Sequence, residues 1–264
     1  MLMNPRVGII GGNGWLGNAM AAAVVASRFV EPSRLTLSGR SDNRGVADIP
    51  GAHWTKDNAE LADRSDVIVL SVRPDQFPAV GVDARGKLVI SVIAGVPARV
   101  IAERTGADQV VRSIPNAAAV IRKSFTPWFA TPPVSPDSKR LVQALLETCG
   151  DACEVPQESH IDCCVGMTGS GAAFPALLAQ AMIEHAIAQG LPPAFARRAA
   201  QGVLVHASQL LAASDDPAPI VDAMIAYRGT TAAALQTMVD RGFKTAVAAG
   251  LEAAASKASA MAAG

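Results

Sequence analysis

The stretch RVGIIGGNGWLGNAM, residues 6–20, decides the fold of this chain. A short apolar run comes first, then a cluster of glycines, then apolar residues at helical spacing. The pattern predicts a strand, a tight turn and a helix. Gly12, Gly14 and Gly17 stand in a G-x-G-x-x-G frame. Such a frame uses glycine for a sharp turn, for close approach of the backbone to a pyrophosphate, and for close helix–strand packing.

The helix start that follows the glycines is suited to an anion. Its free N–H groups and the helix dipole favour phosphate charge. The alternative is a glycine turn without any ligand. Because the frame follows directly on a strand-like run, we favour a dinucleotide site for NAD or NADP.

Length and composition limit the class of protein. The chain has 264 residues, half of them hydrophobic and few aromatic, with a formal net charge of zero. This length suits two domains or one large one. Nucleic acid is not expected as a partner, because binding to phosphates needs clustered lysine and arginine.

We expect a cytoplasmic protein with no membrane partner. A strand at the very N-terminus leaves no room for a signal peptide. The most apolar stretch, Ala172–Ile187, is interrupted by Gln180, Glu184 and His185, so we do not interpret it as a membrane span.

Four cysteines lie close together in the sequence, and His160 lies among them: Cys149, Cys153, Cys163 and Cys164. A metal site is one interpretation. However, there is no C-x-x-C pair, and adjacent cysteines suit a tetrahedral site poorly. We therefore expect no metal and reduced, mostly buried thiols.

Strands and helices alternate after the first helix. Strands are expected at Arg34–Ser38, Asp66–Val72, Lys87–Val92, Gln109–Arg112, Lys123–Ala130 and Ala152–Val155. Helices are expected at Asp57–Ala62, at Pro97–Arg104 with Pro97 in the first turn, and at Pro136–Cys149. This alternation predicts an α/β protein with a Rossmann-type, doubly wound sheet.

The residues after the second strand bear on the choice of cofactor. An NAD enzyme usually carries Asp or Glu there to bind the ribose 2′-hydroxyl. This chain has Arg40 instead, between the hydroxyls of Ser38 and Ser41. That set would accommodate a 2′-phosphate, and the alternative is a solvated surface arginine. We expect NADPH, with NADH as the second choice.

Other residues of the predicted cofactor site lie in the glycine loop and at further strand ends, where ligands bind in such sheets. They are Asn13, Trp15 and Leu16 beside the three glycines, Val72, Arg73 and Pro74 after the strand 66–72, and Ala94 and Gly95 after the strand 87–92.

The composition changes near residues 156–159, and the rest of the chain is alanine-rich and helical. Helices are expected at Phe174–Gln189, Ala194–Ala213, Pro217–Tyr227, Thr230–Arg241 and Phe243–Ala262. We predict a dinucleotide-binding domain over residues 1–158 and a helical dimerisation and substrate domain over 159–264. The face formed by Ala200, Val203, Leu204, Ala207 and Leu211 is apolar. Because these helices are apolar on many sides, we predict a homodimer, or a larger homo-oligomer, joined through this half.

Two stretches of glycine and hydroxyl residues stand out in the helical half. They are Met167–Phe174, which contains Ser170 and Gly171, and Arg228–Leu235, which contains Gly229, Thr230 and Thr231. We expect each to precede a long helix, whose free N–H groups suit a small carboxylate. The alternative is ordinary N-capping. Because two such stretches occur in one domain, we predict these residues as the substrate site.

From end to end the chain resembles the pyrroline-5-carboxylate reductase family. The stretches that carry the resemblance, in the family's order, are VGIIGGNG, SDVIVLSVRP, KLVISVIAGV, VVRSIPNAAA, TGSGAAF, RGTTAAAL and RGFKTAVAAGLEAA. The resemblance implies NAD(P)H-dependent reduction of the C=N bond of 1-pyrroline-5-carboxylate to proline. It also implies a Rossmann domain, a helical dimerisation domain, and a site between the two halves of the dimer.

The resemblance further implies residue roles. Thr231 would be the catalytic residue, hydrogen-bonded to the imine nitrogen. The backbone around Gly229–Thr231 would hold the carboxylate, and Asn116 would lie near the nicotinamide. Hydride comes from the cofactor and a cyclic imine can protonate in water, so no strong general acid is required. We accordingly expect three histidines to be satisfied locally rather than catalytic: His160, His185 and His206.

Three stretches depart from the family's usual pattern. Pro115–Ala119 reads PNAAA where the family usually has PNTPA, and Thr168–Ala173 reads TGSGAA where it has SGSGPA. Ala226–Thr231 reads AYRGTT where it has SPGGTT, so that Tyr227 and Arg228 bring bulk and charge. Arg228 either adds an anchor for an acidic group or points to solvent. Two further hypotheses remain: a related imine or keto-acid reductase, and a cofactor-binding paralogue without turnover.

Overall fold

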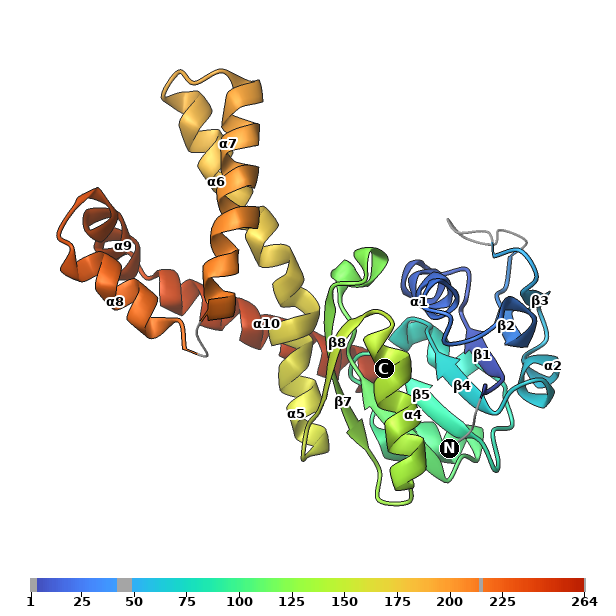
Figure 1. Ribbon diagram of the computed structural model, residues 1–264. Coiled ribbons are helices and arrows are strands. Elements are labelled where there is room, and N and C mark those ends of the chain that lie inside the picture. The colour runs from blue at the N-terminus through green and yellow to red at the C-terminus, as the bar shows by residue number, and fades with distance from the viewer. Residues whose placement is uncertain (1–3, 42–48, 214–215, 264) are drawn as a thin grey trace. The chain divides into compact units, whose positions relative to one another are not determined.

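The computed structural model describes residues 4–41, 49–213 and 216–263 and contains two compact units (Figure 1). One unit comprises Met1–Ala172 and Leu251–Gly264, and the other comprises Ala173–Gly250. We refer to them as the sheet unit and the helical unit. The domain division predicted after residue 158 follows the change in composition, and it stays a prediction.

Within the described residues, the sheet unit is built on an eight-stranded sheet. Its strands are β1 (Val7–Ile10), β2 (Leu35–Ser38), β3 (His53–Thr55), β4 (Val67–Leu70), β5 (Leu88–Ser91), β6 (Gln109–Ser113), β7 (Ser124–Ala130) and β8 (Gly150–Glu154). They lie in the order β3-β2-β1-β4-β5-β6-β7-β8, and the pairs are parallel except for β6 with β7. The strand order reverses between β1 and β4, which is where such sheets bind ligands. The predicted doubly wound sheet is confirmed.

Helices cover both faces of this sheet (Figure 1). One face packs on α1 (Trp15–Ala26) and α4 (Pro136–Glu147), and the other on α2 (Asn58–Asp63) and α3 (Ala98–Thr105). Successive strand residues point to opposite faces, so Ile9 joins the first core and Ile10 the second. Strands buried on both sides need continuous apolar runs, which is why the sequence revealed them.

Several details of the sheet unit differ from the predictions. The strand β3 has three residues with no alternation and was not predicted. Pro97 is the N-cap of α3, one position before the predicted first turn. Short 3₁₀ turns precede or follow strands: η1 (Pro32–Arg34), η2 (Pro74–Ala79) and η3 (Ala117–Ile121).

The prediction that Ser170 and Gly171 lie at a free helix start is wrong. An unpredicted helix, α5 (Glu158–Cys164), continues as a π-helix η4 (Val165–Ser170) and a 3₁₀ turn η5 (Gly171–Ala173). The N–H of Gly171 therefore donates to the carbonyl of Gly166 instead of facing a ligand. A Cβ on Gly166 would lie 2.5 Å from the Leu251 carbonyl oxygen, so this glycine serves close helix packing.

The helical unit contains the helices that the sequence predicted, within a few residues at each end. They are α6 (Phe174–Ala188), α7 (Pro193–Ala207) followed by η6 (Ser208–Ala213), α8 (Ala218–Ala226), α9 (Thr230–Asp240) and the first part of α10 (Phe243–Ala263). Helices α6 and α7 pack as one hairpin, and α8 and α9 as another (Figure 1). On the predicted apolar face, Ala200 is buried, whereas Val203 is 53% and Leu211 is 55% exposed.

In the described part of the chain, one helical run, Glu158–Ala188, is long and apolar enough to cross a membrane by length and composition. That criterion is weak by itself, because core helices of soluble proteins also meet it.

Of the cysteines, Cys149 is buried, but Cys153 and Cys163 are exposed, so the expectation of mostly buried thiols is wrong. No group of three or more potential metal ligands lies together among the residues described.

Candidate cofactor site

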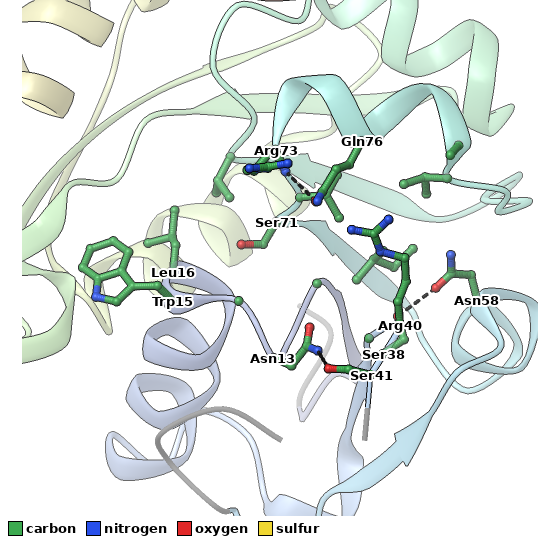
Figure 2. Close-up of a pocket in the computed structure, with 18 of the residues that line it drawn as sticks. Asn13, Trp15, Leu16, Ser38, Arg40, Ser41, Asn58, Ser71, Arg73 and Gln76 are labelled. Atoms are coloured by element: carbon green, nitrogen blue, oxygen red, sulfur yellow. Dashed lines mark hydrogen bonds between the residues drawn. The ribbon is translucent and has the colours of Figure 1, made fainter. Parts of the chain in front are cut away.

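A cavity of about 970 Å³ opens at the carboxyl ends of β1, β2 and β4, next to the point where the strand order reverses (Figure 2). The structure brings nine of the predicted cofactor residues to its wall: Asn13, Gly14, Trp15, Leu16, Ser38, Arg40, Ser41, Val72 and Arg73. In Figure 2, Trp15 and Leu16 lie toward one end of the view, and Arg40 and Asn58 toward the other. The cavity thus has the position and size expected for a dinucleotide.

The glycine loop has the close contacts that the motif requires, but its turn is made by Gly11. This residue has φ +85°, and a Cβ there would lie 2.2 Å from the Ser71 carbonyl oxygen. The predicted turn glycine, Gly12, follows it, and both N–H groups donate to the Ser38 carbonyl at 2.9 Å. A Cβ on Gly17 would lie 2.4 Å from the Gly11 oxygen, so the predicted close packing at Gly17 is confirmed.

The start of α1 presents backbone N–H groups to the cavity. Its N-cap is Gly14, which has no side chain to satisfy them. A pyrophosphate placed there would accept these hydrogen bonds and gain from the helix dipole. The loop and helix start therefore fit the diphosphate of a dinucleotide.

The ends of β2 and β3 form a polar part of the wall. The Ser38 hydroxyl donates to Asn58 Oδ1 at 2.7 Å, and the Asn13 amide donates to the Ser41 hydroxyl at 3.0 Å. Lys56 and Asn58 line the cavity here, and the sequence analysis missed both. They follow the unpredicted strand β3. The signal that could have found them is the helix cap at Asp57, which accepts the Ala59 N–H at 2.8 Å and so marks a strand end just before it.

The charge of the wall favours an anion. Arg40, Lys56 and Arg73 line the cavity, and none of the described residues that line it is Asp or Glu. Arg73 is paired with Asp75 at 2.9 Å. This composition suits a phosphorylated ligand, and the described part of the wall includes no carboxylate for a free ribose 2′-hydroxyl.

Six predicted cofactor residues are not among those that line the cavity: Gly12 and Gly17 of the glycine loop, and Pro74, Ala94, Gly95 and Asn116. Pro74 begins η2, and Ala94 and Gly95 follow β5, where Gly95 has φ +77°. Asn116 caps η3: its Oδ1 accepts the Ala118 N–H at 2.9 Å, and its own N–H donates to the Ser124 hydroxyl at 3.0 Å. Their cofactor roles stay predictions.

A buried arginine fixes the elements next to this region. Arg112 on β6 is 2% exposed and donates to Glu158 at 2.8 Å and to Asp162 at 2.7 Å, both on α5. Glu158 also accepts the N–H of Ala98, the first residue of α3, at 2.7 Å. These contacts hold α5 and α3 against the sheet. No local sequence pattern predicted them.

The second predicted substrate stretch lies in the helical unit as expected. Helix α9 begins at Thr230 after Gly229, and no side chain caps it. Arg228, where the family pattern has glycine, adopts φ +56°, a conformation that favours glycine. Tyr227 is 84% exposed. The structure thus confirms the helix start, while the substrate role of Gly229, Thr230 and Thr231 stays a prediction.

Comparisons with known proteins agree with this architecture. A model of the pyrroline-5-carboxylate reductase dimerisation domain matches residues 158–261, and a model described as NADP oxidoreductase coenzyme F420-dependent matches residues 6–95. A pyrroline-5-carboxylate reductase 3 from Macaca fascicularis is 30% identical over 261 residues, which cover 96% of this chain and 94% of that protein. A pyrroline-5-carboxylate reductase from Synechocystis sp. is 29% identical over 252 residues, covering 93% and 94% of the two chains.

Solved structures share the fold. The crystal structure of Plasmodium falciparum pyrroline carboxylate reductase with NADP bound has a TM-score of 0.86 at 24% identity and covers 98% of both chains. An imine reductase from Myxococcus stipitatus is more distant, with a TM-score of 0.53 at 20% identity over 91% of this chain and 77% of that one. The chain belongs to the pyrroline-5-carboxylate reductase family.

Proposed function

We propose that this protein reduces the C=N bond of 1-pyrroline-5-carboxylate to L-proline with NADPH, a reaction of amino-acid biosynthesis. The observation that carries the proposal is the match to a reductase of this name over 96% of the chain, which includes the predicted cofactor and substrate residues. The cationic cavity at the reversal of strand order supports it independently.

NADPH supplies the hydride when it is bound, so the residues of this chain have to bind and orient. The glycine loop and the start of α1 would hold the diphosphate, and Arg40 with Ser38 and Ser41 would hold the 2′-phosphate. Since the wall has cations and none of its described residues is a carboxylate, NADPH is favoured over NADH.

On the substrate side, the uncapped start of α9 supports a role for Gly229 and Thr230 in holding the substrate carboxylate through backbone N–H groups. We propose that the Thr231 hydroxyl hydrogen-bonds the imine nitrogen and orients the C=N bond. For the other stretch, Gly171 already uses its N–H within the π-helix, so the Ser170 hydroxyl is the group that remains available there.

We propose a homodimer, or a larger assembly of dimers, formed through the helical part of the chain. The dimerisation model matches residues 158–261, and the apolar side chains that this region exposes need a covering surface. A second copy, rather than a membrane, would also cover the apolar helical run 158–188. A cytoplasmic location and the absence of a nucleic-acid partner stay predictions from the sequence.

The loop before α9 favours a second candidate function, a related imine or keto-acid reductase with another substrate. Arg228 occupies a backbone conformation that costs a non-glycine residue about 1 kcal/mol, and such strain persists where surrounding structure or function requires it. With Tyr227 it changes the size and charge of the loop next to the proposed carboxylate site.

The test is NADPH oxidation by the purified protein with 1-pyrroline-5-carboxylate, with product analysis for proline. NADH, other cyclic imines and keto acids are run in parallel. We expect rapid turnover and proline formation, faster with NADPH than with NADH. Turnover only with another imine or keto acid would favour the second candidate. If the protein binds NADPH but none of the substrates causes its oxidation, the protein would be a paralogue without turnover.

A further inference from the structure

The carboxyl end of β3 presents a lysine beside Arg40. Strands β2 and β3 are parallel, with Ser38 opposite Thr55, so the residues after each strand emerge at the same edge of the sheet. The Gly39 N–H donates to the Thr55 carbonyl at 3.4 Å, which extends this pairing by one residue. Arg40 and Lys56 then both line the cavity. Two cations from neighbouring strand ends therefore border the same ligand space.

Hydrogen bonds hold the turn that carries Lys56. The Thr55 hydroxyl donates to Glu60 at 2.5 Å and accepts the Asp57 N–H at 3.0 Å. Glu60 also contacts His53 Nε2 at 2.6 Å, and these hydrogen bonds from Thr55 and His53 lower the pKa of Glu60. Both carboxylates of the turn are thus used to build it, because Asp57 caps α2. The lysine is carried by a fixed segment rather than by a loose loop.

The neighbouring groups form a polar floor of the right kind for a phosphate. Ser38 and Asn58 are hydrogen-bonded to each other, and so are Ser41 and Asn13. A Cβ on Gly39 would lie 2.5 Å from the Asn13 amide, so glycine at this position lets Asn13 reach Ser41. Hydroxyl and amide groups complement cations around a phosphate.

A phosphate monoester carries about two negative charges at neutral pH, more than one arginine balances. We propose that Lys56 binds the ribose 2′-phosphate of NADP(H) together with Arg40 and is a determinant of the preference for NADPH over NADH. The inference rests on the proposed function for its cofactor. It adds the residue that follows β3 to a preference that the sequence had assigned to the end of β2 alone.

The test measures binding by calorimetry, with two probes that differ only in the 2′-phosphate: adenosine 2′,5′-bisphosphate and adenosine 5′-monophosphate. We expect Lys56→Gln to weaken binding of the bisphosphate about tenfold and to change binding of the monophosphate less than about twofold. Lys56→Arg should retain most of the affinity. Arg64→Gln is the matched control, because it removes an exposed cation at the end of α2 that is not among the cavity residues; it should leave both affinities unchanged.

The Arg40→Gln and double variants complete the design. If both cations contact the same phosphate, the double variant should lose less than the product of the two single losses. Unchanged bisphosphate binding in Lys56→Gln beside a loss in Arg40→Gln would overturn the role of Lys56, as would equal losses for both probes. If the unmodified protein binds the two probes equally, NADPH itself is the wrong cofactor, and the proposed function fails in that respect rather than Lys56 alone.

Discussion

The sheet unit and the helical unit differ in how far they bury their apolar side chains. The sheet unit buries residues such as Ile9, Met20 and Leu145 completely. In the helical unit, only Ala196 and Ala200 are buried among the described residues. The sheet unit therefore forms a core from one copy of the chain, whereas the helical unit leaves most of its apolar side chains exposed, as the proposed dimer would require. We infer that a single chain is sufficient to bind the cofactor, whereas turnover requires the proposed dimer.

The largest expected effect is on assembly. Val203→Asp places a charge on the exposed apolar face of α7, where Val203 is 53% exposed. Burying that charge in an interface should weaken self-association about a thousandfold. The control is Val120→Asp on η3 of the sheet unit, because Val120 is equally accessible at 55%. Sedimentation over a concentration series measures the self-association of both variants. Equal self-association of the two would contradict the idea that the helical unit, and not the sheet unit, forms the interface.

The second effect is on the stability of the sheet unit. Arg112→Met removes the buried partner of two carboxylates that are themselves 33% and 45% exposed, Glu158 and Asp162. The free energy of unfolding should therefore fall by about 2 kcal/mol. The control, Arg99→Met, breaks an exposed pair with Glu103 at 2.7 Å and should cost under about 0.5 kcal/mol. Urea unfolding followed by tryptophan fluorescence compares the two. Similar small losses would mean that Arg112 does not hold α5 and α3 to the sheet.

The third effect separates turnover from cofactor binding. Thr231→Ala should lower kcat about thirtyfold, because the proposed hydrogen bond to the imine nitrogen is lost, while NADPH affinity stays unchanged. Thr237→Ala on the same helix is the control, since its hydroxyl donates to the Ala233 carbonyl within α9. Steady-state kinetics and NADPH titration are the measurements. A loss of NADPH affinity in Thr231→Ala would show that the residue has been assigned to the wrong site.

The smallest effect is on acid stability of the sheet unit. The side-chain hydrogen bond from Arg6 lowers the pKa of Asp66, although partial burial acts in the opposite direction. Because the pKa is lower in the folded state, this stabilisation is present above the unfolded value of about 3.9 and is lost as pH falls through the folded pKa. Asp66→Asn should therefore lower the unfolding temperature by about 2 °C at neutral pH. The difference from the unmodified protein should shrink as the pH falls below the unfolded value; a difference that stayed undiminished would have another origin.

The sequence predicted the parts of the fold that depend on neighbours along the chain. Buried strands such as Val67–Leu70 are continuous apolar runs, and helices such as α9 begin at recognisable glycine and threonine positions. The strand β3 was missed because its three residues show no pattern, and Lys56 and Asn58 were missed with it. The contacts of Arg112 were missed because their partners lie 46 and 50 residues away.

Predictions that depended on one glycine's exact role were less accurate. The positive φ of the nucleotide loop is at Gly11, one residue before the motif's first glycine. The TGSG stretch, residues 168–171, has the composition of a helix start, yet it lies within a helical run. Two residues earlier, Gly166 admits the Leu251 backbone. Composition alone cannot distinguish a glycine that frees an N–H group from one that admits a neighbouring backbone.

The most direct test of the account uses the dissociated Val203→Asp protein. NADPH binding is followed by quenching of Trp15, the tryptophan that lines the cavity, and proline formation is measured in the same samples. We predict NADPH affinity equal to that of the unmodified protein, and proline formation that falls in proportion to the fraction of dimer. Loss of NADPH affinity on dissociation, or full turnover by the monomer, would contradict the assignment of cofactor binding to the single chain and of turnover to the assembly.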